Sequence, residues 1–481
     1  MNIFFVHPSA RSRFPEPPMG LASLIIIALR KNCKVAFYDE DKHNKSFVYE
    51  DIIREFNPDI IAVSFMTSQF AFARNLIDRA KRIKPDLPVI VGGVHAAALP
   101  EDTMLDLGNV NYLCYGEGEK TFDGFVDYMS GSKRVEEIKG LVFRRNGEIV
   151  KNTLMPLLSA DELNKLQMPA WDVIYKHGVY TSALTYWNKI VPVFPVITAR
   201  GCPYHCTFCD EGTIWKRILR EREIDAVINE VKYLHKKWGA GHFNILDDTF
   251  TLKPKRVIEF CDKLLENNLT INWRCTAKVG TVTPEMLSYM KKAGCKMIAY
   301  GVESGDQQIL NLIMKKQTLE QVKDAFRITK EAGIMSFALC MVGNIGEDFE
   351  SVKKTARFVS ELNADLFSCA IMTPYPGSEN FEVCKKNGWI LHYDWDKWVP
   401  TPINIREFVP VSRTDKMDRH LMLKSYYYLS RKFLISKLVR RYGKLFFVNP
   451  RFYYNEIITR LKSAGLHGFT RHMLRLFGIA K

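Results

Sequence analysis

Short apolar runs alternate with amphipathic stretches along the first 130 residues of the chain. Apolar runs of about four to eight residues, bounded by polar or Gly/Pro positions, predict buried strands, and apolar residues every three to four positions predict helices. Such an alternation indicates a doubly wound, Rossmann-like parallel sheet. The predicted strands are 2–6, 34–38, 60–65, 89–91 and 112–115, and the predicted helices are 21–30 and 70–84.

A second alternation follows and repeats six times, which predicts a partial (β/α)6 barrel in an α/β protein. Its predicted strands are 194–198, 242–246, 271–276, 297–300, 337–342 and 367–372. Helices are predicted at 222–237, 254–267, 284–293, 321–332 and 349–362. The chemistry of a barrel lies at the carboxyl ends of its strands, so the loops after these strands should hold the functional residues.

The pattern divides the chain into four parts: 1–135, a Rossmann-like domain; 136–190, a linker; 191–390, the partial barrel; and 391–481, a mostly helical region. The linker contains a predicted hairpin, with strands 141–143 and 148–150 on either side of Asn146 and Gly147. Trp395 and Trp398 are expected to cover the barrel mouth.

Composition indicates a globular protein of a reducing compartment. Of 481 residues, 47% are hydrophobic and 12% aromatic, which suffices for large cores. The eleven cysteines are an odd number without paired spacing, which favours free thiols over disulfides. No apolar run is long enough to span a bilayer, and the chain opens on a strand with no basic leader. We therefore expect a cytoplasmic protein.

Charge is concentrated near the C-terminus. The net charge is +15, and residues 413–481 hold 16 Lys and Arg against 3 Asp and Glu. The first interpretation is a set of packing helices with a solvated basic face. A second is peripheral contact with an anionic membrane, which would suit a lipid-like substrate. Nucleic-acid binding ranks last because no recognisable module accompanies the basic and aromatic residues.

Three cysteines, Cys202, Cys206 and Cys209, follow the apolar run 191–197. A loop that wraps three thiolates around a small volume suits an iron–sulfur cluster. Metal-free thiols in a turn are one alternative, and a structural zinc knuckle with His205 as fourth ligand is another. Zinc sites usually take four ligands in two separated pairs, and no second pair follows here.

This loop, with the aromatic Phe208 before the third cysteine, resembles the cluster loop of the radical S-adenosylmethionine (SAM) superfamily. The resemblance implies a 4Fe-4S cluster with one iron open to SAM. Polar residues after the later barrel strands then correspond to the SAM site. The resemblance places Asp247 and Asp248 at the amino group of SAM and Arg274, favoured over Lys278, at its carboxylate. It places Glu303 and Ser304 at the ribose of SAM and Gly343 on the adenine side. Phe208 adjoins SAM, and Tyr375 lies where substrate could sit. The motif 343–347 has Ile345 where proline is usual.

Glycine-rich loops end several predicted strands of the first domain, where a flat ligand can approach the backbone closely. The absence of G-x-G-x-x-G after the first strand counts against a dinucleotide, although another nucleotide is the alternative. The loops 17–21, 91–96 and 116–121 resemble those of the cobalamin-binding radical SAM family, which includes class B-type methyltransferases and anaerobic Mg-protoporphyrin ester cyclases. The contacts implied by this resemblance are Ser64, Met66, Thr67, Gly92, Gly93, His95, Gly116 and Glu117.

One departure concerns the cobalt ligand. Family members that bind cobalt through histidine carry Asp-x-His-x-x-Gly after the first strand, and this chain has His7-Pro8-Ser9-Ala10 there. The resemblance therefore implies cobalamin without a protein histidine on cobalt. His7 and His95 are the two histidines that would contradict this expectation.

The resemblance implies an enzyme that methylates an unactivated carbon of a small-molecule or lipid-like substrate through a 5′-deoxyadenosyl radical and methylcobalamin. An oxidative cyclase is the alternative, and a cobalamin or redox sensor without turnover is a third interpretation. An electron donor such as flavodoxin or ferredoxin is implied. The sequence does not identify the substrate.

Overall fold

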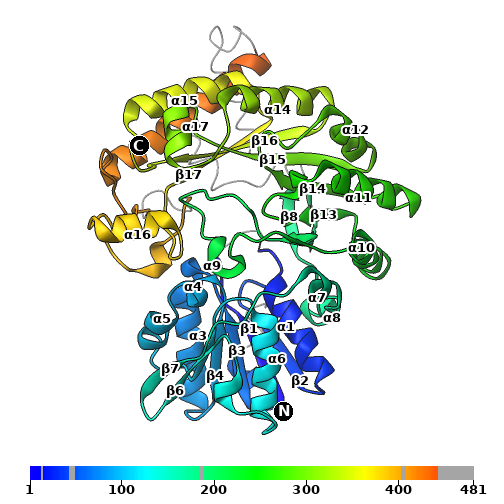
Figure 1. The fold of residues 1–481 in the computed structure, drawn as a ribbon, viewed down its shortest axis with the longest axis vertical. Coiled ribbons are helices and arrows are strands. Elements are labelled where there is room, and N and C mark those ends of the chain that lie inside the picture. The colour runs from blue at the N-terminus through cyan, green and yellow to red at the C-terminus, as the bar shows by residue number, and fades with distance from the viewer. Residues whose placement is uncertain (12–14, 43–48, 185–188, 402–407, 443–481) are drawn as a thin grey trace.

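Two predominantly parallel sheets, one in each half of the chain, organise the molecule (Figure 1). The computed structural model describes residues 1–11, 15–42, 49–184, 189–401 and 408–442. The first sheet and its helices form one end of the elongated molecule, and the second sheet forms the other (Figure 1). In the described residues, no helix combines the length and apolar character that crossing a membrane requires.

The first sheet has the strand order β2-β1-β3-β4-β5-β6-β7. Its elements are β1 (Asn2–His7), α1 (Met19–Arg30), β2 (Lys34–Asp39), α2 (Tyr49–Phe56), β3 (Ile60–Ser64), η1 (Thr67–Gln69), α3 (Phe70–Ile83), β4 (Val89–Gly92), α4 (Val94–Ala98), α5 (Pro100–Asp106), β5 (Tyr112–Cys114), α6 (Gly118–Met129), η2 (Val135–Glu137), β6 (Leu141–Arg145) and β7 (Glu148–Lys151). β1 to β5 are parallel, as the alternation of strands and helices predicts.

Both faces of the first sheet are buried, and β1 shows how. Ile3 and Phe5 belong to the core that includes α1 and α6, whereas Phe4 and Val6 belong to the core that includes α2 and α3. Because successive strand residues point to opposite faces, a continuous apolar run serves a sheet covered on both sides.

The predicted hairpin forms, and it belongs to the first sheet. β6 pairs antiparallel with β5 and β7 with β6, so the sheet continues to Lys151, past the boundary at residue 135 drawn from the sequence. Asn146 and Gly147 have φ of 50° and 86°, as a tight two-residue hairpin turn requires.

The connection to the second sheet packs against both halves of the molecule. It contains α7 (Ala160–Asn164), α8 (Trp171–Ile174) and the pair β8 (Thr181–Leu184) and β9 (Lys189–Pro192). The Trp171 indole donates a 3.0 Å hydrogen bond to Glu230 of the barrel, and Ala170 N–H donates to Ala22 O of α1.

The second sheet is an open, all-parallel barrel wall whose strand order follows the chain, β10-β13-β14-β15-β16-β17. Its elements are β10 (Phe194–Val196), β11 (Ala199–Arg200), α9 (Gly212–Trp215), β12 (Arg220–Glu221), α10 (Ile224–Trp238), β13 (His242–Ile245), η3 (Phe250–Leu252), α11 (Pro254–Glu266), β14 (Asn272–Ala277), α12 (Pro284–Lys292), β15 (Cys295–Glu303), α13 (Gln307–Leu312), α14 (Leu319–Glu331), β16 (Met335–Val342), α15 (Phe349–Leu362) and β17 (Leu366–Ile371). The edge strands β10 and β17 do not pair, so the barrel is partial.

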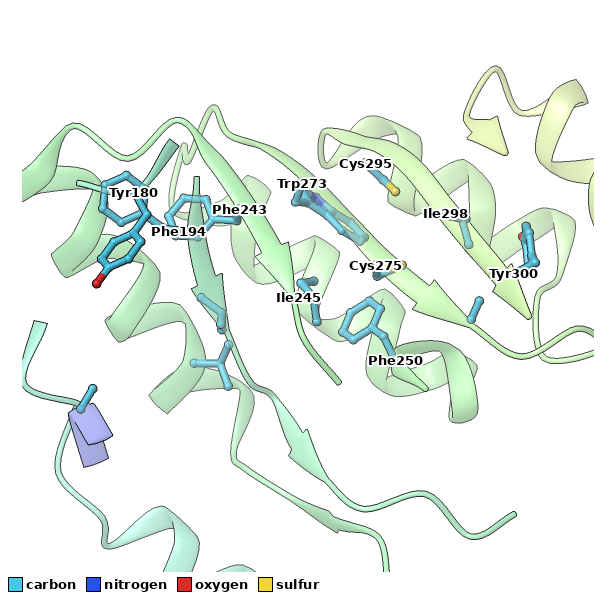
Figure 2. Packing of buried hydrophobic residues seen from close by; sticks show 14 of the residues in the cluster. Tyr180, Phe194, Phe243, Ile245, Phe250, Trp273, Cys275, Cys295, Ile298 and Tyr300 are labelled. Atoms are coloured by element: carbon cyan, nitrogen blue, oxygen red, sulfur yellow. The ribbon is translucent and has the colours of Figure 1, made fainter. Parts of the chain in front are cut away.

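The barrel strands alternate between two environments. On β14, Trp273 and Cys275 are buried in the core beneath the helices, beside Ile245 and Phe250 (Figure 2). Arg274, between them on the same strand, is half-buried on the inner face. This alternation directs polar side chains into the barrel and apolar ones toward the helices.

The C-terminal region packs on the barrel and on the first domain. It contains α16 (Glu379–Lys386), η4 (Trp395–Lys397) and α17 (Arg419–Tyr442). Phe433 of α17 stacks on Phe367 of β17 with ring centroids 4.6 Å apart. The beginning of the basic region is therefore a packing helix, and residues 443–481 lie outside the described residues.

Candidate functional site

The three cysteines lie in the loop between the two-residue strand β11 and the short helix α9. Gly201, just before Cys202, has φ +90°, and a Cβ there would lie 2.2 Å from Ile218 O, so the turn into the loop requires glycine. Cys206 is buried, whereas Cys202 and Cys209 are half-buried. All three thiols therefore lie on one short loop close to the protein surface.

Two lysines face this loop from the barrel. Lys278 at the end of β14 donates to Lys316 O at 3.2 Å, and its Nζ lies 4.4 Å from the ring centroid of Tyr204 in the loop. Burial and the charge of Lys315 lower the pKa of Lys278 to about 8. Lys315 pairs with Glu303 at 2.8 Å. Burial raises the pKa of Cys202 and raises that of Cys209 to about 12, and cations beside thiols act in the opposite direction, toward the thiolate form that binds iron.

Acidic side chains gather on another side of the loop. Asp247 is fully buried, accepts from Thr198 N–H at 2.6 Å, and has its pKa raised by burial to about 6. Burial and the neighbouring Glu211, Asp247 and Asp210 raise the pKa of Asp248 to about 7. Asp247 is buried, whereas Asp248 is exposed and can meet a ligand. Mutual repulsion among neighbouring carboxylates is relieved by a cation, so this group suits a positively charged ligand such as the amino group of SAM.

The later strand ends carry buried acceptors without donors. Glu347 Oε2 accepts from Gly343 N–H at 2.7 Å, but Glu347 Oε1 and Asn344 Oδ1 find no donor among the described residues. Burial raises the pKa of Glu347 to about 7. Unpartnered buried acceptors are uncommon in proteins, and these fit a ligand that brings hydroxyl or amino groups.

Glu303 and Ser304, predicted at the ribose, follow β15 in different roles. Glu303 has φ +60°, which is strained for a residue with a side chain, and its carboxylate pairs with Lys315 beside the cysteine loop. The Ser304 hydroxyl is buried and hydrogen-bonds the Thr355 hydroxyl at 3.1 Å. The structure thus brings Glu303, but not the Ser304 hydroxyl, to the loop.

The side chains of Arg274 and Tyr375 bond to residues outside the cysteine loop, although the segment after Tyr375 adjoins that loop through a 2.9 Å hydrogen bond from Asn380 N–H to Thr207 O. The Arg274 guanidinium is 3.5 Å from Glu16 of the first domain, and Asn244 donates to the same carboxylate oxygen at 3.0 Å. The Tyr375 hydroxyl donates to Trp398 O at 3.1 Å. Of the two basic residues considered for the SAM carboxylate, Lys278 and not Arg274 touches the cysteine loop.

A cavity of about 310 Å³ lies at the carboxyl edge of the first sheet and is lined from both halves of the molecule. Its lining is mostly apolar. From the first sheet it includes Ser64, Gly92, Gly93, Gly116 and Glu117, five of the eight residues predicted to contact cobalamin. A Cβ at Gly93 (φ +103°) would lie 2.3 Å from Phe65 O, so the backbone passes closely there. From the second half, the cavity is lined by Ile197, Arg200, Ile214 and Trp215, which flank the cysteine loop on both sides.

The other predicted cobalamin residues do not line this cavity. Met66 is 50% exposed in the loop after β3, while Thr67 is buried and bonds His95 Nδ1 at 3.1 Å. His95 also packs edge-on against Trp395, with ring centroids 4.9 Å apart. His7 is likewise engaged: Nδ1 lies 3.3 Å from Asp39 and Nε2 lies 3.2 Å from Gln69.

Sequence reasoning missed Arg200 and Arg220. Both guanidiniums bind Glu117 in the first domain, so the Glu117 carboxylate contacts protein and not only the cavity. The available signal was Arg200 standing directly before Gly201 and Cys202. Its partners are more than 80 residues away, and nothing local identifies them.

Within the described residues, no three His, Cys, Asp or Glu side chains converge on a point that could hold one metal ion.

Two family models match the chain. Residues 196–359 match the Radical SAM superfamily and residues 9–126 match the B12 binding domain. The first range contains the cysteine loop and the strand ends, and the second contains most of the cavity lining.

Similar proteins cover nearly the whole chain. An uncharacterized methyltransferase of Pyrococcus horikoshii is 30% identical over 92% of this chain and 96% of its own length. An anaerobic magnesium-protoporphyrin IX monomethyl ester cyclase of Rubrivivax gelatinosus is 26% identical over 92% of this chain and 79% of its own. The solved structure of the methyltransferase TsrM from Kitasatospora setae, with cobalamin and a [4Fe-4S] cluster bound, superposes with a TM-score of 0.68 at 15% identity, covering 90% of this chain and 88% of that one.

Proposed function

The chain belongs to the radical SAM superfamily, and we propose that it methylates an unactivated carbon of a small-molecule or lipid-like substrate. It also contains a B12 binding domain, so its cofactors are a [4Fe–4S] cluster, SAM and cobalamin. One observation carries the proposal. The cavity of the first domain is closed by residues that flank the cysteine loop, so both cofactor sites share a wall. Consecutive radical and methyl-transfer chemistry on one carbon needs such proximity.

The cluster is assigned to Cys202, Cys206 and Cys209. Lys278 and Lys315 offset the negative charge of the thiolates, and Gly201 allows the backbone to turn into the loop. For SAM, the Asp247–Asp248 pair suits the amino group, Glu303 the ribose, and the Gly343–Glu347 loop the adenine side. Support comes from the burial of Asp247, Glu303 and Glu347 and from the acceptors left without donors.

Cobalamin is assigned to the cavity, with Ser64, Gly92, Gly93 and Gly116 against it. The close backbone and the apolar lining suit a large, flat ligand. His7 and His95 are held by Asp39 and Thr67 and do not line the cavity. We therefore infer that no protein histidine binds the cobalt.

When bound, the cluster and SAM supply one-electron chemistry that removes a substrate hydrogen, and cobalamin supplies the methyl group. The protein's own part is to hold both sites together, to keep water away and to keep the carboxylates and lysines in their paired states. The family requires an external reductant, for which flavodoxin or ferredoxin is the proposed class.

A Cys206→Ala variant tests the cluster assignment. Under anaerobic reducing conditions the wild-type protein should form 5′-deoxyadenosine from SAM, and the variant should form none. Cys33→Ala, which removes a buried thiol in the first domain, is the matched control and should retain activity. Full activity of Cys206→Ala would refute the assignment, and absence of SAM cleavage by the reconstituted wild-type protein would favour a sensor.

Oxidative cyclisation is the second candidate, favoured by the similarity to the magnesium-protoporphyrin ester cyclase. SAM with a labelled methyl group, incubated with the enzyme and a small-molecule extract of the source cells, separates the two. A labelled product supports methylation. A substrate-derived product without the label supports the cyclase.

A further inference from the structure

Four charged side chains are buried together between the first domain and the cysteine loop. Arg200 donates to Glu117 and to Glu119, each at 2.6 Å, and Arg220 donates to Glu117 at 2.8 Å. Their side chains are between 3% and 13% exposed. We call Glu117, Glu119, Arg200 and Arg220 the interdomain ion network.

The network is built on rigid backbone on both sides. Arg200 and Arg220 are direct partners in the antiparallel pair β11–β12, so both guanidiniums reach the same carboxylate. Glu117 occupies the N-cap position of α6, with its side chain turned to the arginines and not to the helix backbone, and Glu119 lies in the first turn. Glu117 also accepts from Leu158 N–H at 2.8 Å, and Arg220 donates to Leu158 O at 2.8 Å, which fastens the linker to the same point.

Stability alone is a poor reason for such a network. Burying two carboxylates and two guanidiniums has a large desolvation cost, and apolar residues of similar volume often stabilise a fold as well or better. Burial alone would raise the pKa of Glu117, yet Arg200 and Arg220 hold this pKa below its ordinary value. The Glu117 carboxylate is thus kept ionised in a fixed position, and a fixed position is what the network contributes.

The network lies between the two cofactor sites. Arg200, Glu117 and Glu119 all line the 310 Å³ cavity. Arg200 is also two residues before Cys202, joined to it through the glycine whose turn leaves no room for a side chain. A ligand that fills the cavity must touch the loop 116–119, and any shift of Arg200 moves the backbone of the first cysteine.

We propose that the interdomain ion network couples the two sites, so that cobalamin in the cavity and the cluster on the cysteine loop each strengthen binding of the other. Arg200 is then a positioning residue. When a ligand in the cavity fixes the loop 116–119, the contacts of Arg200 to Glu117 and Glu119 also fix the backbone that leads to Cys202. This inference rests on the proposed function, because it takes cobalamin and the cluster as the occupants of the two sites.

Coupling between sites is reciprocal and can be measured without substrate turnover. The dissociation constant of hydroxocobalamin is measured anaerobically by equilibrium dialysis, for protein with and without a reconstituted cluster. In the wild-type protein we expect the cluster to tighten cobalamin binding about fivefold or more. In Arg200→Ala the ratio of the two constants should approach one, even where both affinities fall. Arg200→Lys, which cannot hold both carboxylates in a fork, should give an intermediate ratio.

Glu230→Gln is the matched control, because Glu230 is also buried and ion-paired, to Arg222 at 2.8 Å, but does not line the cavity. It should keep the wild-type ratio. If Arg200→Ala does not take up iron, Glu119→Gln replaces it, because this substitution weakens only one of the two contacts of Arg200. Glu119→Gln should lower the ratio of the two dissociation constants.

Two results contradict different statements. A wild-type protein that takes up no cobalamin or no iron refutes the proposed function. A wild-type protein that takes up both, but whose coupling ratio is one or is unchanged in Arg200→Ala and Glu119→Gln, overturns the coupling role and leaves the proposed function intact.

Discussion

His95 is a buried neutral imidazole, 1% exposed, between Thr67 and Trp395. Burial lowers its pKa from 6.5 to about 4. In the unfolded chain the same imidazole takes up a proton near its ordinary pKa, so between pH 6.5 and pH 4 the unfolded state binds more protons than the folded state. Stability from this residue is complete above about pH 6.5 and is lost as the pH falls toward 4.

We expect His95 to account for a loss of about 3 kcal/mol in the free energy of unfolding across that window. His95→Gln should flatten the pH dependence by about this amount, measured by urea unfolding at several pH values. The exposed His420→Gln should leave the dependence as it is. Identical slopes in His95→Gln and wild type would show that the imidazole is not buried as described.

Lys278 and Arg274 differ in what they touch, and this sets their expected roles. Lys278 contacts the cysteine loop, whereas Arg274 contacts Glu16 of the first domain. We expect Lys278→Met to weaken SAM binding about tenfold or more, because of these two basic side chains Lys278 is the one placed to make a charge-assisted contact to a carboxylate beside the cysteine loop. Arg274→Met should have a smaller effect. Titration of SAM into the reconstituted protein measures both, and a larger loss of affinity in Arg274→Met would support Arg274, the residue favoured from the sequence, at the carboxylate.

At the scale of elements, the segment around η4 attaches the C-terminal side of the barrel to the first domain. Trp395 packs on His95 and lies 6.5 Å, centroid to centroid, from Phe70 of α3. Trp398 is fully buried, and its carbonyl accepts from Tyr375 in the loop after β17. The two tryptophans predicted to cover the barrel mouth therefore pack against the first domain and against that loop.

Trp395→Ala should lower the free energy of unfolding by about 3–5 kcal/mol, because a large buried aromatic side chain leaves a cavity between two elements. Chemical denaturation measures the change. Tyr393→Ala, two residues away and 50% exposed in the wild-type protein, serves as the control and should have a much smaller effect. Equal effects of the two substitutions would mean that η4 does not hold the first domain.

At the scale of the whole molecule, each hydrophobic core combines residues from more than one region of the chain. One buried cluster includes residues of the first sheet, the linker and the barrel, from Ile3 to Phe433. The other includes the opposite face of the first sheet together with Trp395 and Trp398. A ligand in the shared cavity therefore contacts both halves of a continuous structure.

Hydroxocobalamin should stabilise the whole molecule as a consequence. At about 100 times its dissociation constant, a ligand that binds only the folded state adds about 2.7 kcal/mol, which raises Tm. Thermal unfolding with and without hydroxocobalamin measures this shift. A dinucleotide such as NAD at the same concentration is the control, and a shift with NAD but none with hydroxocobalamin would favour the alternative nucleotide-binding domain.

Much of this architecture is predictable from local pattern. The continuous apolar run of β1 indicates a strand buried on both faces, and the alternation on β14 indicates one polar and one apolar face. The spacing of Cys202, Cys206 and Cys209 predicts an iron–sulfur cluster loop, because it wraps three thiolates around a small volume. The glycines that end β4 and β5 identify the edge of the first sheet where the cavity lies.

Other features depend on contacts that no local pattern contains. The sequence assigns the hairpin β6–β7 to the linker because its own residues do not show that β6 pairs with β5 of the first sheet. Arg274 lies within β14 and Lys278 directly follows its end, and only the folded structure shows that Arg274 contacts Glu16 whereas Lys278 contacts the cysteine loop. His95 follows a glycine pair typical of ligand loops, yet tertiary packing buries it under Trp395.

The sequence by itself determined the strands, the helices and the cofactor loops, because backbone geometry links these to residue spacing over a few positions. Only the tertiary structure decided which side chains meet between the halves. Glu117 and Arg200 are 83 positions apart, and their contact exists because the fold brings the carboxyl edge of the first sheet and the start of the cysteine loop to one cavity. Electrostatic attraction and burial act through space, so the residue that joins the two cofactor sites becomes visible only when the chain is folded.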